Sequence, residues 1–186
     1  MLPLFFLLLI PAVSRAAEIH ISFNALERML SAQMFTDEGR RYVKGSRTDK
    51  CNFAWLEKPS VHEAGGRLLM RARFTGRSSV DILGRCLGLG DSFPLSIIAT
   101  PFYDSGQVGL RDVKVAPDSG HWGFYISRVC AALGTSLEKQ FRYPLAQEAK
   151  TRLDAPDRQL RKFHVTSIRV TTQALVLDVD FMIYVP

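Results

Sequence analysis

The middle of the chain alternates between apolar and charged residues. Over residues 66–74 the apolar side chains from Leu68 to Phe74 recur at every second position, and arginines stand between them. Because a period of two places alternate side chains on opposite faces of a strand, this segment predicts a half-buried strand. Similar patterns and a turn at Asp104–Gly106 predict further strands over 18–23, 78–83, 93–103, 107–115, 163–171 and 174–184.

Two segments have a helical period instead. In residues 24–34, apolar side chains recur three or four positions apart, and either Ser22 or Asn24 can cap the start. In residues 122–145 a longer apolar stripe predicts a long amphipathic helix. We expect a loop or the edge of a strand over the polar segment 36–49, a polar connection over 147–161, and a loop over the glycine-rich segment 84–90. The residues of the longer stripe are Ile126, Val129, Cys130, Leu133, Leu137 and Phe141.

The order of these elements predicts an α+β fold. Strands grouped between helices favour an antiparallel sheet. We expect a curved antiparallel sheet wrapped around the long amphipathic helix, with a shorter N-terminal helix beside it. The space between the sheet and the long helix would hold either a closed core or an elongated apolar groove.

The N-terminus has the features of a secretory signal peptide. Residues 2–13 are almost wholly apolar, which suits the central region of a signal peptide and is short for a membrane span. Small residues follow, so we expect cleavage after Ala16, with Ala17 as the second choice. The prediction is a signal peptide over 1–16, a single domain over 17–186, and a periplasmic or secreted location. The alternatives are an uncleaved anchor and a buried helix.

Composition and charge limit the classes of partner that we expect the protein to bind. The chain is 47% hydrophobic and 23% charged, as in ordinary globular proteins, and its formal net charge is +6. Since an exported protein rarely meets nucleic acid, we expect none as a partner. Anionic lipid headgroups or cell-envelope polymers, and hence an anionic membrane surface, are the candidate acidic partners. The alternative is that the charge serves solubility alone.

Three cysteines follow the predicted signal peptide. Cys130 lies on the apolar face of the predicted long helix, so it is expected to be a small buried hydrophobe. Cys51 and Cys86 lie in polar or glycine-rich surroundings. If one disulfide forms in an oxidising compartment, we expect it to join these two. Closing a loop of about 35 residues would stabilise the fold by roughly 3–4 kcal/mol.

No catalytic or metal-binding pattern emerges. The four histidines have no metal-ligand spacing, and neither a nucleophile elbow nor a phosphate-binding loop is present. Asp178 and Asp180 share a strand face, but they alternate with apolar residues as a solvent-facing edge does. Cys86 would need a neighbouring base to act as a nucleophile. We therefore predict no catalytic residues, no metal, no cofactor and no enzymatic activity.

The order of elements resembles a known family. The segments that carry the resemblance are the strand and helix over 19–30, the strands over 66–76, 93–103 and 106–115, the long helix and the terminal hairpin. They resemble the small bacterial envelope proteins of the tubular lipid-binding (TULIP) superfamily. Many such proteins begin with an acylated cysteine, which this chain lacks, so the mature protein is expected to be free of a lipid anchor.

The resemblance implies binding of a lipid, a fatty-acyl chain or another apolar ligand. The interior side chains would then line the ligand groove, and methionine suits adaptable apolar sites. The same side chains would equally form a closed hydrophobic core. The expected ligand-binding residues are Leu26, Met29, Leu30, Leu68, Met70, Phe74, Ile126, Leu133, Leu137, Leu177, Val179 and Phe181.

Two other functions compete with ligand binding. A closed-core envelope scaffold or inhibitor would contact an acidic partner through basic residues on its strands. A hydrolase would use Asp178 and Asp180, or Cys86. The sequence leaves the ligand, the partner protein and the oligomeric state open. The basic residues of the scaffold hypothesis are Arg40, Arg41, Arg67, Arg71 and Arg73.

Overall fold

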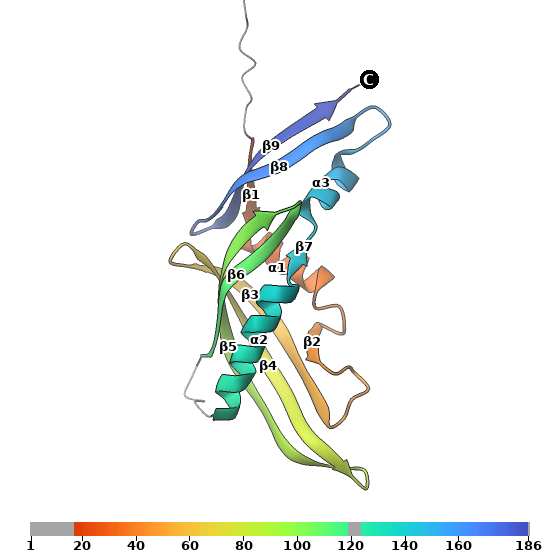
Figure 1. Ribbon diagram of the computed structural model, residues 1–186, viewed down its shortest axis with the longest axis vertical. Coiled ribbons are helices and arrows are strands. Elements are labelled where there is room, and N and C mark those ends of the chain that lie inside the picture. The colour runs from red at the N-terminus through yellow and green to blue at the C-terminus, as the bar shows by residue number, and fades with distance from the viewer. Residues whose placement is uncertain (1–16, 119–123, 186) are drawn as a thin grey trace, which may run out of the picture.

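The computed structural model describes residues 17–118 and 124–185, which form two antiparallel sheets and three helices (Figure 1). The larger sheet has the order β2-β3-β4-β5-β6-β7, and the smaller sheet has the order β1-β9-β8. The larger sheet consists of β2 (Arg40–Lys44), β3 (Asn52–Ala64), β4 (Arg67–Ile82), β5 (Arg85–Asp104), β6 (Gln107–Pro117) and β7 (Arg142–Tyr143). The smaller sheet consists of β1 (Ala17–Ser22), β8 (Gln159–Val170) and β9 (Ala174–Tyr184). The helices are α1 (Phe23–Gln33), α2 (Phe124–Gln140) and α3 (Leu145–Leu153). The predicted signal peptide lies outside the described residues, and the single domain over 17–186 stays a prediction.

The main core lies on the inner face of the larger sheet. Phe74 of β4 stands opposite Phe93 of β5 in the register, their ring centroids are 5.1 Å apart, and both side chains are buried. Leu95 and Ile97 continue the same face along β5, as the period of two requires. From α2, Ile126, Cys130 and Leu133 pack into this cluster. A second cluster, which includes Val165, Leu175, Leu177 and Val179, lies on the smaller sheet.

The expected α+β fold with a sheet wrapped around a long helix is wrong. The structure is mostly β, and its helices have 11, 17 and 9 residues. The predicted helix over 122–145 ends at Gln140 because the chain then extends, so that Arg142 and Tyr143 pair with β6 before Pro144. The strands are longer than their apolar periods indicated, since β4 has 16 residues and β5 has 20.

Part of that extra strand length comes from the segment 84–90, where we expected a loop. Residues 85–90 belong to β5 and pair with the end of β4 in a long hairpin that projects from one end of the molecule (Figure 1). Leu83 and Gly84 form the two-residue turn, both with positive φ (51° and 78°), and Leu83 is fully exposed. Val80, Ile82, Leu87 and Leu89 are also exposed, so this end of the hairpin extends beyond the main core.

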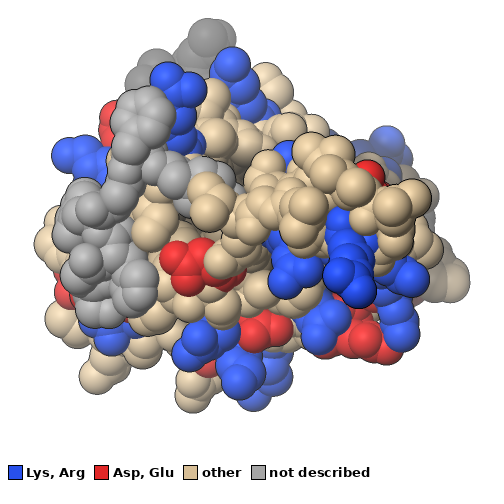
Figure 2. Space-filling model, turned by 90° about the horizontal axis from the view of Figure 1, so that it is seen from below, with Lys and Arg blue, Asp and Glu red and all other residues tan. Residues whose placement is uncertain are grey.

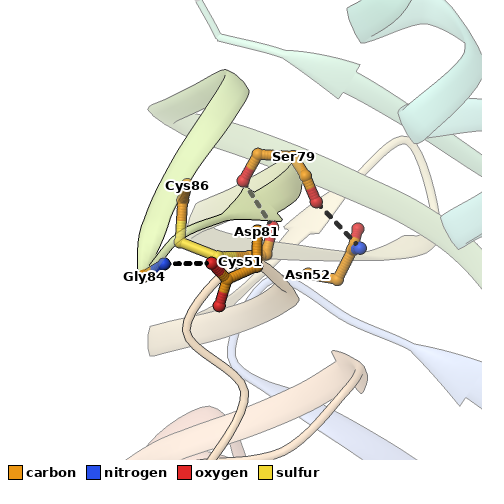
Figure 3. The surroundings of a disulfide bond; sticks show 6 residues. All are labelled: Cys51, Asn52, Ser79, Asp81, Gly84 and Cys86. Carbon is orange, nitrogen blue, oxygen red and sulfur yellow. Dashed lines mark hydrogen bonds between the residues drawn. A yellow bond between two sulfur atoms is a disulfide. The ribbon is translucent and has the colours of Figure 1, made fainter.

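The Cys51–Cys86 disulfide forms as predicted and fastens this hairpin to the start of β3 (Figure 3). Around it, Ser79 donates from its backbone N–H and its hydroxyl to the carbonyl of Cys51, and Asn52 donates to the carbonyl of Ser79. Gly88 stands very close to β4: a Cβ added at this position would lie 2.4 Å from the carbonyl oxygen of Ser78. Glycine is therefore required where the hairpin bends past the disulfide.

Candidate functional site

An apolar cavity of about 350 Å³ lies where the two sheets meet. Its walls come from α1, the inner face of strands β3 to β6, the C-terminal end of α2, the start of α3, and Leu175 and Leu177 of β9. Aliphatic and aromatic side chains make up most of the lining. Both the volume and the lining fit a small-molecule site, since such sites typically occupy about 300–1,000 Å³ and carry few polar groups.

Specific hydrogen bonds position α1 as one wall of the cavity. The hydroxyl of Ser22 caps the helix by accepting from the backbone N–H of Ala25 (3.3 Å). A bulge in β3 breaks its pairing with β4 between Glu57 and Ser60. Glu27 of α1 then accepts the backbone N–H of Val61 (2.7 Å), which ties the helix to β3. The apolar side of α1, including Leu26, Met29 and Leu30, is thereby turned to the cavity.

The opposite wall is the short connection between α2 and α3. Tyr143 of β7 stands opposite Val108 of β6 in the register, and both line the cavity. The backbone N–H of Ala146 donates to the carbonyl of Gly106 (2.9 Å), which fixes the start of α3 to the turn between β5 and β6. Leu145 therefore contributes both to the cavity and to the second core cluster.

Among the residues that the structure describes, the lining contains two arginines and no acidic residue. Arg142 donates from Nη1 to the carbonyl oxygens of Glu138 (3.0 Å) and Phe141 (2.6 Å), and its guanidinium lies over the Phe102 ring. Arg41 stands on the edge strand β2 opposite Leu56, whose side chain is buried in the core. Within the described residues, the side chain of Arg41 makes no hydrogen bond or ion pair, so its charge is available to a ligand.

Seven of the expected ligand-binding residues line this cavity: Leu26, Met29, Leu30, Leu68, Met70, Leu137 and Leu177. The others lie elsewhere. Phe74, Ile126 and Leu133 belong to the main core cluster, Val179 belongs to the second cluster, and Phe181 is 41% exposed near the end of β9. The structure thus contains both a closed core and a cavity, and the expected residues are divided between them.

Sequence reasoning missed the polar residues of the site. Arg41 was named only among the basic residues of the scaffold hypothesis, and the segment around Arg142 was expected to be helical. A weak signal for Arg41 was its alternation with Arg40 and Tyr42, but the bulge between Tyr42 and Lys44 ends that alternation before the apolar Val43. Gln33, Gln140 and Tyr143 have no comparable signal, since each lies at the end of its element.

A smaller hollow of about 240 Å³ lies between α2 and β6. Polar residues, including Thr135 and Glu138, share its lining with Val113, Val115 and Ile126. It lacks the apolar character of the larger cavity. The larger cavity is therefore the candidate site.

Four of the five basic residues of the scaffold hypothesis, Arg40, Arg67, Arg71 and Arg73, lie on the outer face of the larger sheet, and Arg41 does not. Arg40 lies 3.7 Å from Glu57 and stacks over Trp55, whereas Arg41 faces the other way. Arg67 donates to the carbonyl of Asp112, and Arg71 and Arg73 lie exposed along β4. Seen from the hairpin end, Lys and Arg side chains alternate with Asp and Glu (Figure 2).

The candidate catalytic residues are engaged in structural contacts. Asp178 accepts from the hydroxyl of Ser167 and from Arg169 (3.0 Å), and these bonds hold the pKa of its carboxyl below the usual value. Asp180 pairs with Lys162 (2.6 Å), and Cys86 is in the disulfide. Cys130 is buried, and burial raises the pKa of its thiol. Among residues 17–118 and 124–185, no group of three or more metal-ligating side chains is placed to hold a metal ion.

Across the described parts of the chain, none of the helices has both the length and the apolar character that a membrane span needs.

Comparisons with known proteins do not show which family the chain belongs to. No protein-family model and no curated protein sequence match the chain. A solved structure described as a lipopolysaccharide binding protein is similar over 91% of this chain, with 13% sequence identity and a TM-score of 0.30. This chain spans about half of that structure, since 50% of the other chain is covered. A likeness of this size does not assign the chain to a family.

Proposed function

We propose that the protein binds the hydrocarbon chain of a lipid or similar amphiphile in the cavity between its two sheets. The observation that carries the proposal is the apolar lining of a 350 Å³ cavity that stands beside two well-packed core clusters. A core that needed only stability would bring these apolar side chains into contact with one another, because each Å² of apolar surface removed from water contributes about 25 cal/mol. A hydrocarbon chain would restore those contacts.

The chemistry of the lining supports a flexible chain more than a rigid polar ligand. Met29, Met34 and Met70 contribute to the walls, and methionine side chains adapt to irregular apolar shapes. Each methylene that leaves water contributes about 0.8 kcal/mol. We expect decanol to bind about fifteenfold more tightly than octanol, since two methylenes are worth about 1.6 kcal/mol.

The test fills the cavity from one wall. Met70→Trp adds a large ring to the lining, whereas Met182→Trp makes the same change at a residue that is 59% exposed and outside the cavity. Titration calorimetry with decanol should show binding to the wild type and to Met182→Trp, and strongly weakened binding to Met70→Trp. Thermal unfolding checks that both variants fold. Equal affinity of all three proteins, or of octanol and decanol, would contradict the proposal.

Export to the periplasm or the cell exterior is part of the same proposal. The Cys51–Cys86 disulfide supports it, because structural disulfides persist mainly in oxidising compartments. Expression of the full chain followed by N-terminal sequencing of the exported protein tests it. The expected first residue is Ala17, and retention of the intact N-terminus inside the cell would contradict it.

A further inference from the structure

We propose that the ligand is a single-chain amphiphile with an anionic head, and that Arg41 is the residue that binds this head. The inference rests on the proposed function, because it concerns the same cavity. It goes further in naming the class of ligand and the residue that selects it.

The orientation of Arg41 is the first step. In β2, Arg40 pairs with Glu57 on one face of the sheet, and Arg41 therefore points to the opposite face. That face is the inner one, since Leu56, which stands opposite Arg41 in the register, is buried, and Arg41 itself belongs to the cavity lining. An edge strand thus directs a guanidinium toward an apolar cavity.

The second step concerns the two charged side chains that line the cavity. Arg142, the other charged residue of the lining, is paired to Gly109 in the register and already donates to two backbone carbonyls. Gly109 lies against the Phe102 ring, so the Arg142 side chain is held against that ring rather than toward a ligand. Among the described residues of the lining, Arg41 is therefore the cationic residue whose side chain has no partner. No carboxylate of that lining neutralises its charge.

The match to a ligand follows from these two steps. A guanidinium binds carboxylate or phosphate oxygens through two parallel N–H donors, and such charged hydrogen bonds are stronger than neutral ones. Arg41 is exposed, whereas Leu56 and Ile97 of the same lining are buried. A bound molecule would accordingly place its chain against the inner wall and its anionic head at the rim beside Arg41.

The test compares ligands that differ only in the head. Decanoate carries the anion and decanol does not, so titration calorimetry with both separates head binding from chain binding. For Arg41→Gln, we expect decanoate binding to weaken about tenfold, and decanol binding to stay within about twofold. Arg41→Lys, which keeps the charge, should retain part of the decanoate affinity.

Arg71→Gln is the matched control. It removes the same charge from an exposed position on β4 outside the cavity lining. Binding of both ligands should stay as in the wild type. An equal loss of decanoate affinity in Arg71→Gln would show general attraction to a basic protein and would overturn the assignment of Arg41.

Other outcomes separate the two proposals. If the wild type binds decanol and decanoate and Arg41→Gln weakens both or neither, the role of Arg41 is wrong and the apolar site stands. If the wild type binds neither ligand, both proposals are wrong. Decyl phosphate in place of decanoate shows whether the head is a phosphate or a carboxylate. Inorganic phosphate alone should not compete, and competition would contradict a chain-bearing ligand.

Discussion

Removal of the Cys51–Cys86 disulfide should destabilise the protein by an amount that the structure allows us to work out. The bond joins residues 35 positions apart. In the chain-entropy description, a crosslink that closes a loop of this length lowers the entropy of the unfolded chain, which corresponds to about 4 kcal/mol at 25 °C. The double variant Cys51→Ser/Cys86→Ser preserves side-chain size, and the hydrogen bonds of Ser79 to the Cys51 carbonyl do not depend on sulfur.

Urea unfolding followed by circular dichroism measures this change. With a slope of about 2 kcal/mol per molar urea, the midpoint should fall by about 2 M. The wild type in dithiothreitol should shift to the midpoint of the variant, which provides the control. Cys130 stays in every protein, since it is buried and unpaired. A loss below about 1 kcal/mol, or a wild type insensitive to the reductant, would refute the reasoning.

Two further predictions concern the turn and the smaller sheet. Leu83 has a φ of 51° and a fully exposed side chain, so Leu83→Asn should raise the free energy of unfolding by about 1 kcal/mol in urea unfolding, because Asn-Gly is the favoured sequence of this two-residue turn. An unchanged or lower midpoint would contradict it. Asp178 has a lowered pKa because of hydrogen bonds from Ser167 and Arg169. Its stabilising contribution is therefore present above the usual Asp value of 3.8 and is lost as the pH falls through the lower folded value. Thermal unfolding of Asp178→Asn should show a lower midpoint at neutral pH and a smaller decline below pH 3.8 than the wild type, and parallel profiles would exclude this role.

The strands with one buried face were predictable from the sequence. The alternation through Leu68, Met70 and Phe74 reports burial against a core, and β4 and β5 form there as expected. Beyond Gly76 both faces of the hairpin are largely exposed. Val80 and Ile82 still kept the period of two, so a strand was predicted over 78–83, but the glycines of 84–90 favoured a loop where β5 begins. The disulfide was predictable because the surroundings of Cys51 and Cys86 differ from the apolar helix face that carries Cys130.

The cavity could be predicted only in part. Leu68 and Phe74 belong to one apolar face of one strand, yet the first lines the cavity and the second is in the closed core. The difference depends on where α1 and α2 cover the sheet, and that is set by contacts distant in sequence, such as Glu27 with Val61. The extent of α2 was likewise set by pairing of β7 with β6 rather than by its own apolar stripe.

The short strand β7 has a consequence for the rate at which a ligand would exchange. β7 is one edge of the larger sheet and is paired at two positions, Val108–Tyr143 and Gly109–Arg142. Pro144 follows and has no backbone N–H with which to extend the ladder. Because so few bonds hold this part of the cavity rim, local opening there requires much less free energy than global unfolding. Ligand release should therefore proceed at the same rate in the wild type and in the protein that lacks the disulfide.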